Sequence, residues 1–133
     1  MTSTITRRRP SSPQEMHPIF KEYLKAGDLE GIVSLYEEGA AMPNNEGTTV
    51  TGLAAIRENM SAFVAMDAKI TFEPAIVHQA GDIALVHAKW SAKGKGPDGP
   101  IEFAGVTSEI VRRQPDGTWL YLVDDPGIGA TAP

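Results

Sequence analysis

Apolar residues in the first half of the chain recur at helical spacing. Ser12, Pro13 and Glu15 are typical of a helix N-terminus, with a capping residue, a proline in the first turn and a glutamate three residues after the cap. The apolar positions that follow lie on one helical face: Met16, Ile19, Phe20, Tyr23 and Leu24. Gly27 is predicted to end this helix, because glycine readily adopts the left-handed conformation of helix C-termini.

Two further helices are predicted before the pattern changes. Asp28 is placed to cap a second helix that ends at Gly39, with a buried face made of Leu29, Ile32, Val33 and Tyr36. Residues 40–50 contain proline, asparagine and glycine, which predict a short irregular hairpin. A third helix is predicted from Thr51 or Gly52, with inward positions Leu53, Ile56, Met60, Phe63 and Val64.

The second half of the chain alternates apolar and polar positions, which predicts strands. The predicted strands are residues 69–79, 83–93, 101–113 and 119–125, and the predicted loops are residues 94–100 and 114–117. Pro74 has no amide donor and indicates a sheet edge or a bulge. Because strands joined by tight turns are antiparallel, we expect an α+β fold in which helices cover one face of an antiparallel sheet.

Alternation also assigns strand residues to the two faces of this sheet. The face toward the helices is expected to carry Ala84, Val86, Ala88 and Trp90, followed by Phe103, Gly105, Thr107, Glu109 and Val111. On the last strand, Leu122 and Asp124 are expected on the same face, and Tyr121 and Val123 on the outer face.

The length and composition are typical of a single globular domain. The 133 residues are 41% hydrophobic and 22% charged, which argues against disorder. We expect residues 1–11 to form a disordered arm, residues 12–126 a single pocket domain, and residues 127–133 a flexible tail.

Several classes of function are disfavoured. The net charge is -5, and Arg7–Arg9 is the one basic cluster, so no nucleic-acid partner is expected. The chain has no cysteine, which excludes disulfides and thiolate chemistry. Its three histidines, His17, His78 and His87, lack metal-ligand spacing, and each is expected to be structural or exposed. No apolar run suggests a leader or a membrane span, and we expect a cytoplasmic protein.

A set of short features occurs in a fixed order along residues 12–126. They are Tyr23-Leu24 before Gly27-Asp28, then Leu29, Ile32, Val33 and Tyr36, then Gly52 with Leu53 and Ile56, Gly81-Asp82 with Trp90, and Gly117 with Trp119. In this ordered combination the chain resembles the nuclear transport factor 2-like superfamily. The branch containing ketosteroid isomerases and the SnoaL-like polyketide cyclases is the most similar.

This resemblance implies a cone-shaped curved sheet wrapped around three N-terminal helices, with a pocket at its wide end. It also implies homodimers that pair through the outer sheet face, and no metal or organic cofactor. The superfamily contains isomerases, cyclases and dehydratases as well as non-catalytic assembly modules, so the fold alone assigns no chemistry.

Ketosteroid isomerases serve as a template at three positions. Their catalytic base matches Asn44, which cannot take a proton at neutral pH. Their oxyanion tyrosine matches Phe20, and their second oxyanion donor, a protonated aspartate, matches Glu109. The chain is therefore not expected to be a functional ketosteroid isomerase, although one carboxyl group is kept.

Glu109 and Asp124 are the candidate acid and base, and Asn44 a candidate hydrogen-bond donor. Two carboxyl groups on neighbouring strands raise the pKa of one of them, which suits proton transfer. Alternatively, Glu109 lies at the sheet edge and pairs with Arg57 or Arg112, and Asp124 with Asp125 belongs to a chain-terminating turn. Both interpretations remain open from the sequence.

The expected function is the binding of a small, mostly apolar carbonyl-containing molecule. The expected pocket lining is Phe20, Tyr36, Met42, Ile56, Phe63, Val86, Trp90 and Thr107. If the protein is an enzyme, cofactor-free isomerase or lyase chemistry is expected. The alternative is a non-catalytic dimerisation module, which an apolar outer face around Leu85, His87 and Tyr121 would support.

Overall fold

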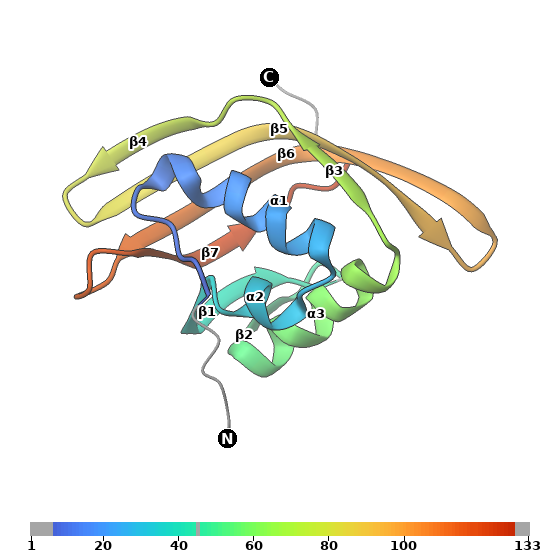
Figure 1. Ribbon diagram of the computed structural model, residues 1–133, viewed down its shortest axis with the longest axis horizontal. Coiled ribbons are helices and arrows are strands. Elements are labelled where there is room, and N and C mark those ends of the chain that lie inside the picture. The colour runs from blue at the N-terminus through green and yellow to red at the C-terminus, as the bar shows by residue number, and fades with distance from the viewer. Residues whose placement is uncertain (1–6, 45, 130–133) are drawn as a thin grey trace.

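The computed structural model describes residues 7–129 except residue 45. One 3-10 turn, Pro13–Glu15, precedes the helices α1 (Met16–Ala26), α2 (Leu29–Val33) and α3 (Leu53–Ala65). The strands are β1 (Tyr36–Pro43), β2 (Thr49–Thr51), β3 (Lys69–Phe72), β4 (Ile76–Ala80), β5 (Ile83–Gly96), β6 (Gly99–Arg113) and β7 (Trp119–Asp125). Figure 1 shows the long strands β5 and β6 arching over α1, with α2 and α3 below.

The strands form one curved, unclosed sheet. Its order is β2-β1-β7-β6-β5-β3, and β4 also pairs with β5. Strands joined by tight turns are antiparallel as predicted, but β1 pairs with β7 in parallel. The expected α+β class is therefore confirmed, with one parallel pair that the sequence did not indicate.

The predicted helix boundaries around Gly27 are confirmed. Gly27 has φ 67°, the left-handed conformation expected of a C-cap. The Asp28 carboxylate accepts a hydrogen bond from the Gly31 amide at 3.0 Å and so caps α2. Gly52 precedes α3, also as predicted.

The predicted extent of the second helix is wrong. This helix ends at Val33, and Tyr36 begins β1. Tyr36 lies opposite Tyr121 of β7, and the two rings pack with centroids 4.9 Å apart. Tyr36 fits the apolar spacing of a helix, but pairing with a strand distant in the sequence buries it and overrides that local pattern.

Two strand boundaries also differ from the prediction. Residues 69–79 form two strands, because the segment around Pro74 interrupts pairing with β5. Residues 94–100 are not a loop: β5 and β6 stay paired to Gly96 and Gly99, where Gly99 has φ 122° and permits the tight reversal.

Tyr121 does not lie on the outer face. The pairing of β6 with β7 shifts between Ile110 and Val111, so that Ile110 lies opposite Val123 but Val111 opposite Tyr121. Leu122 is the extra residue of a β-bulge, which breaks the alternation used for the prediction. Tyr121 therefore joins Val111 in the core.

The ends of the described chain contact the domain. Arg7 makes an ion pair with Asp28 at 3.3 Å, and the Trp119 amide donates to the Pro10 carbonyl at 2.9 Å. Residues 1–6 and 130–133 of the expected arm and tail lie outside the described residues. In the part of the chain that the structure describes, no helix is long and apolar enough to cross a membrane.

Gly31 lies where α2 packs on α1, so a substitution at Gly31 tests this packing. A Cβ there would lie 2.4 Å from the Tyr23 ring and 2.7 Å from an Asp28 carboxylate oxygen, so Gly31→Ala should lower the free energy of unfolding by about 1–3 kcal/mol. Gly39→Ala is the matched control, since its Cβ meets nothing within 4 Å. Urea denaturation of both variants is the measurement, and equal stabilities would contradict the packing described.

Candidate functional site

The structure brings Glu109 and Asp124 together inside the sheet. Glu109 of β6 lies directly opposite Asp124 of β7. Both side chains are buried on the face toward the helices, where Val111 and Tyr121 continue the core. The two carboxyl groups therefore share a site from which water is largely excluded.

Glu109 is held by two hydrogen-bond partners. One carboxyl oxygen lies 2.6 Å from His17 Nε2, and the other accepts from the Thr107 hydroxyl at 2.7 Å. The alternative ion pairs are not formed, because Arg57 pairs with Glu30 and Arg112 with Glu37. Glu109 is thus an interior residue rather than part of the sheet edge.

His17 was missed as a site residue. It lies in the first turn of α1, its ring stacks on Phe72 with centroids 4.4 Å apart, and it is buried. Its Nδ1 atom is buried and has no hydrogen-bond partner among the described residues. The sequence did contain a signal for the burial of His17. His17 lies three residues before Phe20 and seven before Leu24, and it therefore shares the apolar face of the helix.

Asp124 is held by Tyr36, whose hydroxyl donates to its carboxyl group at 2.5 Å. Burial, and after it the negative charge of Glu109, raise the pKa of Asp124 to about 8, although the hydrogen bond from Tyr36 opposes this rise. Burial, together with the neighbouring Asp124, also raises the pKa of the Tyr36 hydroxyl well above its usual value. At neutral pH, Asp124 is therefore a protonated carboxyl group that can donate a proton.

The side chains described above contain both an acid and a base for proton transfer. With its proton on Nε2, His17 donates to the Glu109 carboxylate and keeps a lone pair on Nδ1. A carboxylate that orients a histidine in this way favours the tautomer able to accept a proton. Asp124 supplies the acid on the adjacent strand.

The predicted lining residues are mostly core residues. Seven are buried: Phe20, Tyr36, Met42, Ile56, Val86, Trp90 and Thr107. Phe63 is half-buried and packs against this core. Asn44 lies in the turn between β1 and β2, where its side-chain oxygen accepts from the amides of Glu46 and Thr48 at 2.9 and 3.0 Å. It shapes the hairpin, and no hydrogen bond joins it to the carboxyl pair among the described residues.

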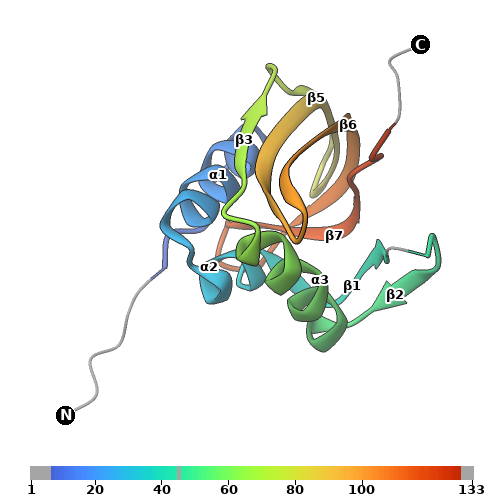
Figure 2. The same ribbon diagram turned by 90° about the vertical axis from the view of Figure 1, so that its right-hand side faces the viewer.

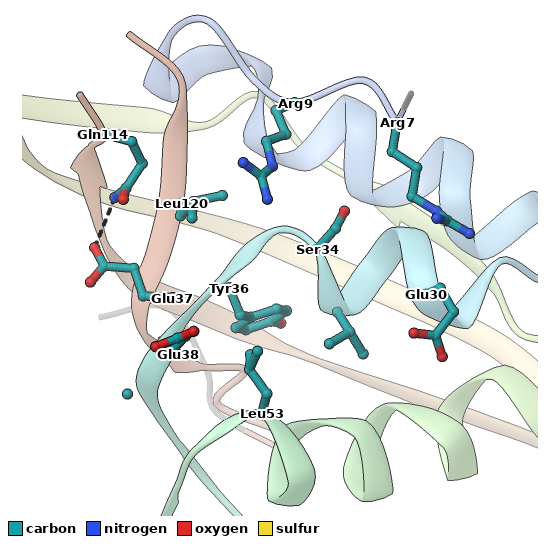
Figure 3. A pocket seen from close by; sticks show the side chains of 12 residues that line it. Arg7, Arg9, Glu30, Ser34, Tyr36, Glu37, Glu38, Leu53, Gln114 and Leu120 are labelled. Atoms are coloured by element: carbon teal, nitrogen blue, oxygen red, sulfur yellow. Dashed lines mark hydrogen bonds between the residues drawn. The ribbon is translucent and has the colours of Figure 1, made fainter. Parts of the chain in front are cut away.

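An open groove of about 650 Å³ lies outside the predicted pocket. Figure 3 shows it between the N-terminal segment, the start of β1 and the first turn of α3. Its floor is apolar, with Tyr36, Leu53 and Leu120, and charged side chains such as Arg9 and Glu38 surround it. Tyr36 is the one predicted lining residue among those that line the groove.

No group of three or more potential metal ligands occurs among residues 7–129 apart from residue 45.

The raised pKa of Asp124 makes stability depend on pH. Below about pH 4, Asp124 is protonated in both the folded and the unfolded chain; above that, only the folded chain retains the proton until the pH passes about 8. The free energy of unfolding should therefore fall across this window. Asp124→Asn should remove the fall and be more stable than the natural chain at pH 9, by roughly 3–5 kcal/mol.

Thermal denaturation of both chains across this pH range is the measurement. Asp116→Asn is the control, because Asp116 is exposed and its hydrogen bonds to Thr118 lower its pKa instead. A constant stability difference between Asp124→Asn and the natural chain would contradict a protonated, buried Asp124.

Comparison with known structures places the fold. A nuclear transport factor 2-like protein from Salmonella enterica matches with a TM-score of 0.76 and 15% identity, covering 90% of this chain and 89% of that one. A protein from Streptomyces avermitilis named as a proposed dehydratase of the same family matches with a TM-score of 0.70 and 18% identity, covering 82% and 88%. At these identities the likeness establishes the fold alone.

A third structure is the CaMKII hub of S. rosetta, with a TM-score of 0.70 and 18% identity, covering 90% of this chain and 99% of that one. No protein with a curated description matches the chain. The SnoaL-like domain model matches residues 20–121, which is most of the described structure and includes Tyr36, Glu109 and Tyr121. The chain therefore belongs to the SnoaL-like domain family.

Proposed function

We propose that this protein binds a small, mostly apolar carbonyl compound and transforms it by cofactor-free acid/base catalysis, of the isomerase, cyclase or dehydratase type. The observation that carries this proposal is the buried constellation of Glu109, Asp124, His17 and Tyr36. Buried ionisable groups are costly to retain in a core, and such clusters occur most often at functional sites.

His17 is the base of this reaction and Asp124 the acid. His17 Nδ1 removes a proton from the substrate carbon, while Glu109 stabilises the imidazolium that forms. Asp124 donates its hydrogen bond, or its proton, to the carbonyl oxygen on which negative charge develops. Tyr36 keeps the Asp124 carboxyl group in place through its short hydrogen bond.

Native mass spectrometry of the gently purified protein identifies a retained ligand, and turnover of that molecule then tests the roles. Glu109→Gln and Asp124→Asn should each lower kcat by about 100-fold or more. Glu102→Gln is the control, because Glu102 lies on the same strand as Glu109, is exposed, and pairs across the hairpin with Lys93. Unchanged turnover in both site variants would refute the catalytic proposal.

A second candidate function is self-association through the outer face of the sheet. One row of neighbouring residues crosses four strands on that face: His78, Leu85, Ile110 and Val123. Leu85 is 42% exposed and Ile110 36% exposed, an apolar pair that a second copy of the chain would cover. The similarity of the fold to a CaMKII hub supports this candidate.

Ile110→Lys tests the self-association surface. It should convert a dimer into a monomer, because it places an unpaired charge at the centre of the covered face. Ile101→Lys is a matched control: Ile101 lies on the same strand and is also 36% exposed, but it lies far from this row. Sedimentation equilibrium gives the masses, and equal masses for the two variants would exclude this face as the interface.

A further inference from the structure

After β7 ends, the chain continues along β6 in the same antiparallel direction. Figure 2 shows this last described segment beside β6. Ile128 lies opposite Gly105, the Gly129 amide donates to the Ala104 carbonyl at 2.7 Å, and the Val106 amide donates to the Gly127 carbonyl at 3.4 Å. We call residues 126–129 the C-terminal strap.

The strap pairs with β6 at its edge, and its main chain also reaches the inner face of the sheet at Gly105. A Cβ on Gly105 would meet the Gly127 carbonyl oxygen at 2.2 Å. Gly105 occupies the same sheet face as Thr107 and Glu109, and Trp90 of β5 lies directly opposite it. Only a residue without a side chain admits the strap at this point.

Two polar side chains of the same face bind main-chain carbonyls where β7 joins the strap: Asp125 is the last residue of β7, and Pro126 is the first residue of the strap. The Trp90 indole N–H donates to the Pro126 carbonyl at 2.8 Å, and the Thr107 hydroxyl donates to the Asp125 carbonyl at 3.2 Å. Thr107 also donates to Glu109 at 2.7 Å, and it has one proton for the two bonds. The carbonyl group at the end of β7 therefore competes with the candidate catalytic carboxyl group for this donor.

An aromatic cluster borders these donors. Trp90 and Phe103 meet edge to face with centroids 5.6 Å apart, and Phe63 of α3 meets Phe103 in the same way at 5.8 Å. These aromatic rings offer an apolar surface next to the N–H and O–H groups that donate to carbonyl oxygens. Ile128, the one large apolar residue of the strap, is 63% exposed, so hydrogen bonds rather than burial hold the strap closed.

We propose that the strap is an internal occupant of a ligand subsite, formed by Trp90, Thr107 and Phe103, that recognises carbonyl oxygens attached to an apolar body. The ligand displaces the strap, accepts the hydrogen bond that Trp90 donates to Pro126, and gains the aromatic surface. The inference takes only the ligand class from the proposed function. Few buried contacts oppose local opening of such a segment, so the exchange is energetically accessible.

A chain that ends at Asp125 tests this inference. It should bind benzoylacetone, which carries two carbonyls and a phenyl ring, with a Kd lower by about tenfold than the full chain, since no strap must be displaced. Butylbenzene has a similar skeleton without carbonyls and should show a much smaller gain. Trp90→Phe in the shortened chain should remove the preference for benzoylacetone. NMR titration reports each Kd.

Gly105→Ala tests the same subsite in the full-length chain. The added Cβ should expel the strap, so that the Gly129 and Val106 amides lose their protection against hydrogen exchange and the Kd for benzoylacetone falls as in the shortened chain. Gly39→Ala is the control and should behave as the natural chain.

An equal Kd in the full and shortened chains would overturn the inference. Retained amide protection in Gly105→Ala would overturn it as well. Neither readout uses turnover, so loss of the proposed catalysis leaves this test intact. Conversely, the full and shortened chains could have the same Kd while Glu109→Gln is inactive. That result would refute the strap proposal and leave the proposed catalysis standing.

Discussion

Between Ile110 and Val111 the pairing of β6 with β7 shifts by one residue, and this shift brings Tyr121 and Asp124 to the same face of the sheet. In a regular strand, two residues three apart point to opposite faces. Without the bulge, the register that pairs Val111 with Tyr121 would direct Asp124 outward, and Glu109 would face an apolar neighbour. One extra residue therefore allows a tyrosine that completes the core and an aspartate that completes the site to occupy the same short strand.

The buried polar groups then tie together elements that are distant along the chain. His17 links α1 to β6 through Glu109, and Tyr36 links β1 to β7 through Asp124. Each of these contacts satisfies a group whose burial alone would be unfavourable. His17 Nδ1 is the exception, because it is buried without a partner among the described residues. In the proposed reaction, this unsatisfied atom is the one that accepts the substrate proton.

The sequence predicted correctly those features that depend on residues close together in the chain. Gly27 and Asp28 were correctly placed because C-capping and N-capping depend on a few adjacent residues. Glu109 and Asp124 were placed on neighbouring strands because the turn that joins those strands is short. The end of α2, the parallel pairing of β1 and the bulge at Leu122 were not predictable, since each is decided by contact between segments far apart in sequence. His17 was overlooked for the same reason: its partner lies on another element, although its place on an apolar helical face was visible.

Thr107 connects the end of β7 to the candidate site. Its single hydroxyl proton is shared between the Asp125 carbonyl and Glu109, and His17 is the other hydrogen-bond partner of Glu109. Asp125 directly precedes the strap, and Trp90 donates to the first strap carbonyl on the same face of the sheet. The main chain at the end of β7 and the buried carboxyl group therefore meet at one side chain, which has a single proton for two acceptors.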